Sequence, residues 1–121
     1  MSRVMHFEIP ADNPERAGKF YSGVFGWQIQ KWDGPMEYWM VTTGQDGPGI
    51  NGGLMRREGN AGICNTVTVE SLDESLKKVQ AQGGKVTVPP MEIPGVGMLA
   101  YCQDTEGNPF GVLQPEKMSP A

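Results

Sequence analysis

The hydrophobic pattern begins with an alternation from Val4 to Ile9, which predicts a β-strand with one packed face. His6 and Glu8 lie together on the other face of this strand. A helix is expected next, because Asp12 or Asn13 can cap it ahead of Pro14 and Gly26 can end it. Apolar residues recur in it at helical spacing and predict a core-facing stripe of Ala17, Phe20, Tyr21, Val24 and Phe25.

Three more strands are predicted in this half of the chain, at residues 27–31, 36–43 and 50–56. The second half repeats the order. It has a strand at 63–69, a helix from Ser71 or Leu72 to Gln82, a strand at 85–88, a proline-rich loop at 89–94, and strands at 97–103 and 109–114. A shift of about 58 residues lays one half on the other and places Met40 on Met98. We therefore expect one domain over residues 1–121, with βαβββ modules at 3–57 and 63–116 and a connector at 58–62.

Composition narrows the classes of function. The chain has 121 residues, of which 38% are hydrophobic and 20% charged, with a net charge of −4, as expected for a globular protein without a nucleic-acid partner. No apolar run approaches the roughly 18 residues that span a bilayer, and the first ten residues do not resemble a secretion signal. We expect a soluble, cytoplasmic protein with no membrane partner.

Cysteine and histidine are scarce, which restricts metal chemistry. Cys64 and Cys102 lack the spacing of a zinc-binding pair and are expected to be buried thiols. His6 is the single histidine, so a site built from two or three histidines cannot be assembled within one chain. Any metal would depend on carboxylates or amides.

Three motifs resemble the vicinal oxygen chelate superfamily, which includes glyoxalase I (lactoylglutathione lyase), bleomycin-resistance proteins and extradiol dioxygenases. They are HFEIPAD from His6, FYSGVFGW from Phe20, and QDTEGNP from Gln103, which is similar to the D-P-x-G-N turn before that family's last strand. The resemblance covers essentially the whole chain. It implies an α+β fold in which two tandem βαβββ modules form an incomplete barrel around a cavity, and it implies a homodimer.

In metal-using members of that superfamily, the first and last strands of each module carry the ligands. The corresponding positions in this chain are His6, Cys64 and, near the last strands, Gly52 and Gly111. Glycine offers no side-chain donor, so the resemblance implies an incomplete metal site and no cofactor is predicted. His6 and Cys64 remain the only candidate ligands for a divalent metal, with Glu8 as a nearby carboxylate.

The same resemblance implies that inward-facing residues contact a small-molecule ligand. Because Tyr38 and Trp39 are adjacent, they should point to opposite faces of their strand, one of them into the cavity. The candidate ligand-binding residues are His6, Glu8, Tyr38, Trp39, Gly52, Cys64, Thr66, Tyr101 and Gly111. Each also has a purely structural interpretation, such as core packing, an ion pair or strand propensity.

Three functions stay open at this point. The first is a glyoxalase-related protein that binds a small oxygenated molecule without a complete metal site, with or without transforming it. If it is catalytic, His6 would shuttle a proton, with Glu8 as its partner. The second is a metal-dependent lyase, isomerase or dioxygenase whose ligands a dimer partner or water completes. The third is a non-catalytic drug-sequestering protein, for which the acidic charge favours cationic compounds.

Overall fold

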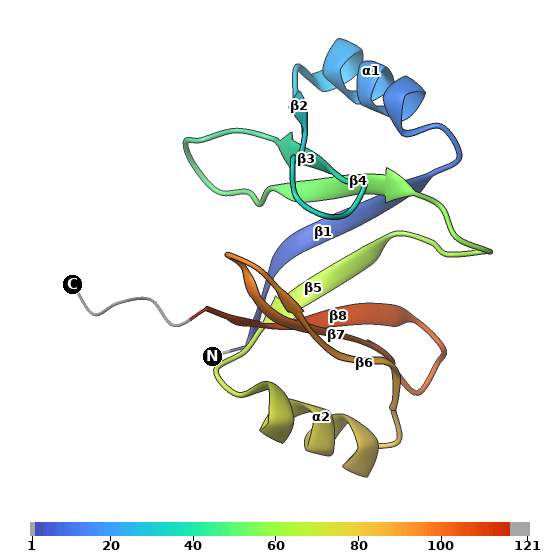
Figure 1. The fold of residues 1–121 in the computed structure, drawn as a ribbon, viewed down its shortest axis with the longest axis vertical. Helices are drawn as coiled ribbons and strands as arrows, with labels where there is room; N and C mark the ends of the chain where they lie inside the picture. Colours follow the sequence, from blue (N-terminus) through green and yellow to red (C-terminus); the bar gives the residue numbers. More distant parts are fainter. Residues whose placement is uncertain (1, 117–121) are drawn as a thin grey trace. The chain divides into compact units, whose positions relative to one another are not determined.

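The computed structural model describes residues 2–116, which divide into two compact units. We call His6–Cys64 the N-terminal unit, and residues 2–5 with 65–116 the C-terminal unit. Along the chain, the order of elements is βαβββ twice, as the repeated hydrophobic pattern predicts (Figure 1). The α+β fold class and the paired βαβββ modules are confirmed.

In the N-terminal unit, the strand order is β2-β3-β4-β1, and β1 runs parallel to β4. Asn13 caps the helix by accepting a hydrogen bond from the backbone N–H of Arg16 at 3.0 Å, and Gly26 ends it in the left-handed conformation, with φ 72°. The elements are β1 (Arg3–Ala11), α1 (Pro14–Phe25), β2 (Gln28–Lys31), β3 (Trp39–Thr42) and β4 (Gly52–Arg56).

The C-terminal unit has the corresponding strand order β5-β8-β7-β6, with β5 parallel to β8. Ser71 caps its helix through a hydrogen bond from the backbone N–H of Glu74. The elements are β5 (Cys64–Thr68), α2 (Leu72–Ala81), β6 (Lys85–Ile93), β7 (Gly97–Gln103) and β8 (Pro109–Pro115).

Two predicted strand boundaries differ most from the observed ones. The proline-rich segment 89–94 was expected to be a loop, yet β6 continues through it to Ile93. This strand stands at the end of its unit's strand order, and its pairing with β7 shifts register between Val86 and Met91, so it can hold prolines that donate no hydrogen bond. The strand expected over 36–43 begins only at Trp39.

Each unit has its own hydrophobic core. The N-terminal core is Ala11, Trp39, Val41 and Leu54, and the C-terminal core is Val69, Leu72, Leu76, Ala100, Cys102 and Val112. Both Cys64 and Cys102 are buried, as expected. No helix within residues 2–116 is both long and apolar enough to cross a bilayer.

The core-facing stripe predicted for α1 was right for Ala17, which packs against the N-terminal core, and wrong for three of its other residues. Phe20, Val24 and Phe25 are all more than half exposed to solvent, whereas Pro14 and Gly18 are the buried residues of the helix. A β-carbon at Gly18 would lie only 3.2 Å from Ile29, so the helix approaches its sheet through this glycine. Phe20 and Val24 lie on the side of the helix away from this contact.

Strand pairing shows where the two halves correspond. Glu8 pairs with Gly53 as Thr66 pairs with Gly111, in agreement with the shift read from the sequence. The third strands do not follow that shift. Gly53 pairs with Met40, but Gly111 pairs with Tyr101, so the expected equivalence of Met40 and Met98 was wrong.

Candidate functional site

A phenol, an imidazole and a carboxylate meet on one face of the sheet in the N-terminal unit. The Tyr38 hydroxyl lies 2.7 Å from Nε2 of His6 and donates to Oε2 of Glu8 at 3.4 Å. His6 and Glu8 reach it together because alternate residues of β1 share a face. We call His6, Glu8 and Tyr38 the polar triad.

The loop before β3 holds Tyr38 in place. A 2.8 Å hydrogen bond from the backbone N–H of Trp32 to the carbonyl of Tyr38 joins the two ends of this loop. The Trp32 ring packs edge-on against the Tyr38 ring, with the centroids 6.1 Å apart. Within this loop, next to Tyr38 in sequence, Glu37 forms an exposed ion pair with Arg56 at 3.1 Å. The phenol therefore comes from a loop anchored at both its ends.

Gly53 makes the room that the Tyr38 hydroxyl occupies. It is the cross-strand partner of Glu8, and its own β-carbon would overlap the Tyr38 ring and hydroxyl. A side chain at position 53 is therefore incompatible with the observed position of Tyr38. The equivalent overlap at Gly52 is with Phe7, on the opposite face of β1. Of the two glycines, only Gly53 belongs to the polar triad's face.

Burial sets the protonation states of the triad. Burial lowers the pKa of His6 from its usual 6.5, so the imidazole is neutral at pH 7. Burial, and next the negative charge of Glu8, raise the pKa of Tyr38 far above its usual 10, so the phenol keeps its proton. Glu8 itself is only 8% exposed. The site thus combines a neutral base, a protonated phenol and a buried acid.

The phenol has one proton and two neighbours that can accept it. When Tyr38 donates to Glu8, the Nε2–H of His6 donates to the phenol oxygen; in the other histidine tautomer, Tyr38 donates to Nε2. The two arrangements differ only in where protons sit. Tyr38 can therefore connect the charge of Glu8 to the imidazole of His6, which have the hydroxyl between them.

The other predicted site residues do not belong to the polar triad, and each has its own place in the structure. Trp39 packs in the N-terminal core, opposite to Tyr38, so of this adjacent pair only Tyr38 joins the polar triad. In the C-terminal unit, Thr66 and Tyr101 both lie beside Gly111, whose β-carbon would contact them at 3.0 and 3.5 Å. Cys64 is buried at the start of β5. The two hydrogen bonds that define the triad join His6, Tyr38 and Glu8 to one another.

The donor set does not fit a metal centre. Among residues 2–116, no three side chains of His, Cys, Asp or Glu are grouped so that they could hold a metal ion. Glycine stands at both last-strand positions, 53 and 111, and Nε2 of His6 already faces the Tyr38 hydroxyl.

The sequence places the last-strand position near Gly52 and leaves Gly52 and Gly53 open, and in the structure Gly53 is the residue that faces the triad. The signal that distinguishes them is alternation around Leu54, which is fully buried in the core. Because neighbouring strand residues point to opposite faces, Gly53 must lie on the face away from that core. The central place of Tyr38 could not be found in this way, because it lies just outside a strand.

Comparison with known proteins gives three kinds of similarity. Residues 3–44 match the family described as bleomycin resistance protein-like N-terminal. A glyoxylase-like domain-containing protein of Didymella fabae is 28% identical over 120 residues, covering 91% of each chain. The putative glyoxylase CFP32 of Mycobacterium bovis is 30% identical over 118 residues, covering 89% of this chain and 42% of that protein. The chain thus spans less than half of this mycobacterial relative.

Solved structures share the fold at low sequence identity. The hypothetical protein BH1468 of Bacillus halodurans superimposes with a TM-score of 0.74 at 14% identity, covering 99% of both chains. The methylmalonyl-CoA epimerase of Mycobacterium tuberculosis gives 0.71 at 13% identity, covering 94% of this chain and 88% of that one. At such identity, the likeness establishes the fold alone.

Proposed function

The chain belongs to the vicinal oxygen chelate superfamily, and from that premise we propose that it binds a small oxygenated molecule at the polar triad and transfers a proton on it. The ligand class follows from the chemistry of the triad, which offers a phenol proton to an oxygen and a neutral imidazole to an acidic C–H. The reaction class is proton removal next to a carbonyl group.

One observation carries the proposal: the Tyr38 hydroxyl lies in the space of a side chain at position 53 and contacts both His6 and Glu8. A protein donor thus stands where the superfamily resemblance expects a last-strand ligand. A hydroxyl cannot supply the charge of a cation, but it can hydrogen-bond an oxygen that gains negative charge. This is the chemical reason to expect binding without a complete metal site.

The proton balance of the reaction closes within the triad and its ligand. A carbonyl oxygen of the ligand replaces one of the present partners of Tyr38 and accepts its hydrogen bond. His6, neutral at pH 7, takes the proton from the adjacent carbon and becomes an imidazolium, and the electron pair moves toward the carbonyl oxygen. Return of the proton to carbon restores His6. Glu8 acts through Tyr38 as a positioning residue, and its charge favours the imidazolium.

A relative's name supports this reaction class. Solved structures with the same fold include methylmalonyl-CoA epimerases, and epimerisation at carbon is removal and return of one proton. A second candidate is sequestration without turnover, favoured by the match of residues 3–44 to a bleomycin-resistance-like family. The two functions share the binding step and differ in whether the bound molecule exchanges its C–H proton.

The test begins with a thermal-shift screen of 2-oxo and 2-hydroxy acids, aldehydes and ketones, because a molecule that binds only the native state raises the melting temperature. The best compound is then titrated into wild type and Tyr38→Phe, and its exchange of C–H for deuterium is followed by NMR. We expect Tyr38→Phe to weaken binding by roughly tenfold, the loss expected for one hydrogen bond to a charge-bearing oxygen. His6→Gln should abolish exchange.

Ser22→Ala is the matched control. It also removes a hydroxyl that donates a short hydrogen bond, 2.8 Å to the carbonyl of Trp27, but at the helix and not at the triad. It should leave affinity and exchange unchanged. Equal affinity of wild type and Tyr38→Phe would contradict the proposed site. Tight binding with no exchange would support sequestration instead of catalysis.

A further inference from the structure

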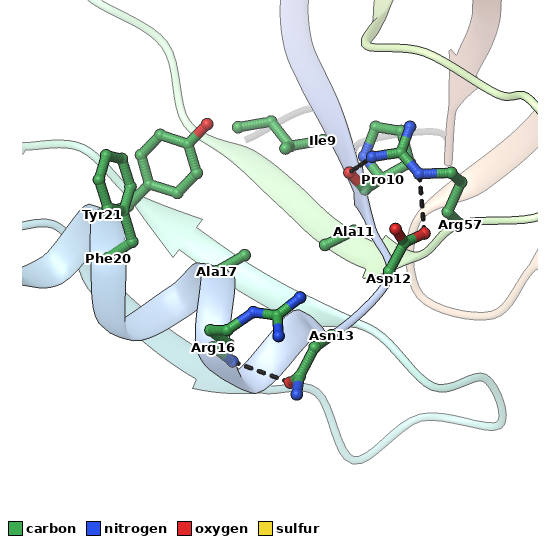
Figure 2. A pocket seen from close by; sticks show the side chains of 10 residues that line it. All are labelled: Ile9, Pro10, Ala11, Asp12, Asn13, Arg16, Ala17, Phe20, Tyr21 and Arg57. Carbon is green, nitrogen blue, oxygen red and sulfur yellow. Dashed lines mark hydrogen bonds and ion pairs between the residues drawn. The ribbon is translucent and has the colours of Figure 1, made fainter.

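A groove lies between α1 and the end of β1, within the N-terminal unit and separate from the polar triad. It has a volume of about 450 Å³, within the range of roughly 300 to 1,000 Å³ that small-molecule sites occupy. Ile9 faces this groove, and Glu8, its neighbour in β1, points to the other face of the strand. The lining residues belong to β1, to the turn of Asp12 and Asn13, and to α1, and Arg57 joins them from just after β4 (Figure 2).

The groove carries one positive charge that nothing in the described chain neutralises. The guanidinium of Arg57 already has partners, because it donates to Asp12 at 3.1 Å, to the carbonyl of Ala61 at 2.8 Å and to that of Pro10 at 3.4 Å. The negative charge of Asp12 is therefore paired with the positive charge of Arg57. Within residues 2–116, the guanidinium of Arg16 has no hydrogen bond or ion pair, and Figure 2 shows its side chain extending along the groove.

An aromatic wall lies one helical turn from this charge. Residues four apart share a helix face with β-carbons about 5 to 6 Å apart, so Arg16 and Phe20 form one row and Ala17 and Tyr21 the next. The Phe20 and Tyr21 rings meet edge-on at 5.3 Å, and Tyr21 stacks on Trp27 at 5.2 Å. Phe20 is nevertheless 59% exposed, so the unit itself does not cover the ring.

We propose that this groove is a second ligand site, which takes an organic monoanion with a flat apolar body, such as an aromatic carboxylate or sulfonate. The anionic group pairs with the guanidinium of Arg16, while the ring covers Phe20 and rests against Ala17. A single negative charge is specified, because Arg57 and Asp12 already neutralise each other. A neutral ring would gain the apolar contact but leave Arg16 unpaired.

The proposal is tested with 8-anilinonaphthalene-1-sulfonate as the probe and N-phenyl-1-naphthylamine, the same ring system without the sulfonate, as its neutral counterpart. Fluorescence titration measures affinity, and amide shifts in NMR spectra locate the probe. We expect one molecule of the anionic probe per chain, shifts concentrated at residues 9–21 and 57, and binding at least roughly tenfold weaker for the neutral probe.

Two pairs of variants separate this groove from general stickiness. Arg16→Gln should weaken the anionic probe by roughly tenfold, whereas Lys19→Gln removes the same charge from the same helix outside the groove and should not. Phe20→Ala should also weaken it, whereas Phe25→Ala, which removes an equally exposed ring (60%) that does not line the groove, should not.

Three outcomes of the titrations would overturn the proposal. They are the absence of binding, equal affinities for the charged and neutral probes, and equal effects of the two variants within either pair. Amide shifts outside the groove would likewise reject it. The triad and its proposed reaction are not involved in any of these readouts.

Discussion

The Tyr38 hydroxyl occupies the space that a side chain on Gly53 would fill. These two residues are far apart in sequence, and neither is chemically unusual alone. Together they place a protonated phenol against His6 and Glu8 on the face where last-strand residue 53 pairs with Glu8. The absence of a β-carbon at position 53 is therefore a condition for the polar triad.

Gly53→Ala should destabilise the protein by roughly 1 to 3 kcal/mol, the usual cost of forcing extra volume into a packed site. The cause is the overlap with Tyr38, so the cost should shrink when Tyr38→Ala is introduced first. Denaturant unfolding of the wild type, both single variants and the double variant measures this coupling.

Gly44→Ala is the control for the cycle. A β-carbon added at Gly44 would meet no atom within 4 Å, and the backbone there is not left-handed, so this change should alter stability by less than about 0.5 kcal/mol. If Gly53→Ala costs the same with and without the Tyr38 ring, the two residues do not compete for space.

His6 gives the protein a specific dependence on pH. Because burial lowers the pKa of His6, the unfolded chain takes up a proton below pH 6.5 that the folded chain refuses. The contribution to stability is fully present above pH 6.5 and is lost as the pH falls through the lower folded value. Since the sequence has a single histidine, NMR titration of the imidazole reports this residue alone.

The same pKa shift is also tested by measuring the free energy of unfolding at several pH values between about 7.5 and 5. His6→Gln should lose the part of the slope that lies below pH 6.5 and keep the part due to carboxylates. A wild-type imidazole whose pKa lies above 6.5 would contradict the neutral base on which the proposed proton transfer depends.

Chelation should not affect ligand binding. The described residues offer no group of three metal-ligating side chains, so the proposed site depends on the hydrogen bonds of Tyr38 and His6. Protein dialysed against EDTA should bind the screened compound with unchanged affinity, and adding Zn²⁺, Ni²⁺ or Mn²⁺ should not strengthen it. Recovery of lost binding by one of these ions would instead support a metal site completed by a second chain.

Gly23 lies within α1 and Gly26 at its C-terminal end, and together they offer a matched test of the backbone conformation there. Neither has any atom within 4 Å of an added β-carbon, but only Gly26 has a left-handed backbone, with φ 72°. Gly23→Ala should stabilise the protein by roughly 0.5 to 1 kcal/mol, and Gly26→Ala should destabilise it by about 1 to 2 kcal/mol. Thermal unfolding that shows the same sign for both changes would contradict the assigned end of the helix.

The order of elements was predictable because caps and turns are local signals. Asn13 and Ser71 cap their helices, Gly26 ends the first, and Asp104 closes the turn before β8 by accepting from the backbone N–H groups of Glu106 and Asn108. Each signal acts within a few residues of the chain, so it can be read without knowing the tertiary contacts.

What could not be predicted depends on packing between segments. The apolar side of α1 was assigned to the core because helical spacing does not reveal which side approaches the sheet, and Gly18 turned out to set that approach. In the same way, sequence analysis gave Tyr38 and Trp39 opposite faces but not their destinations. The contact of Tyr38 with His6 requires the loop from Trp32 and the space at Gly53.

The most direct test of the central claim is the long-range ¹H–¹⁵N NMR spectrum of the single imidazole in wild type and Tyr38→Phe, recorded without ligand and with the compound found in the screen. We predict that Tyr38→Phe shifts the Nε2 resonance, whose hydrogen bond spans 2.7 Å, and that the ligand moves the same resonance in wild type. An Nε2 resonance unchanged by both would contradict the claim that Tyr38 and His6 together form the ligand site.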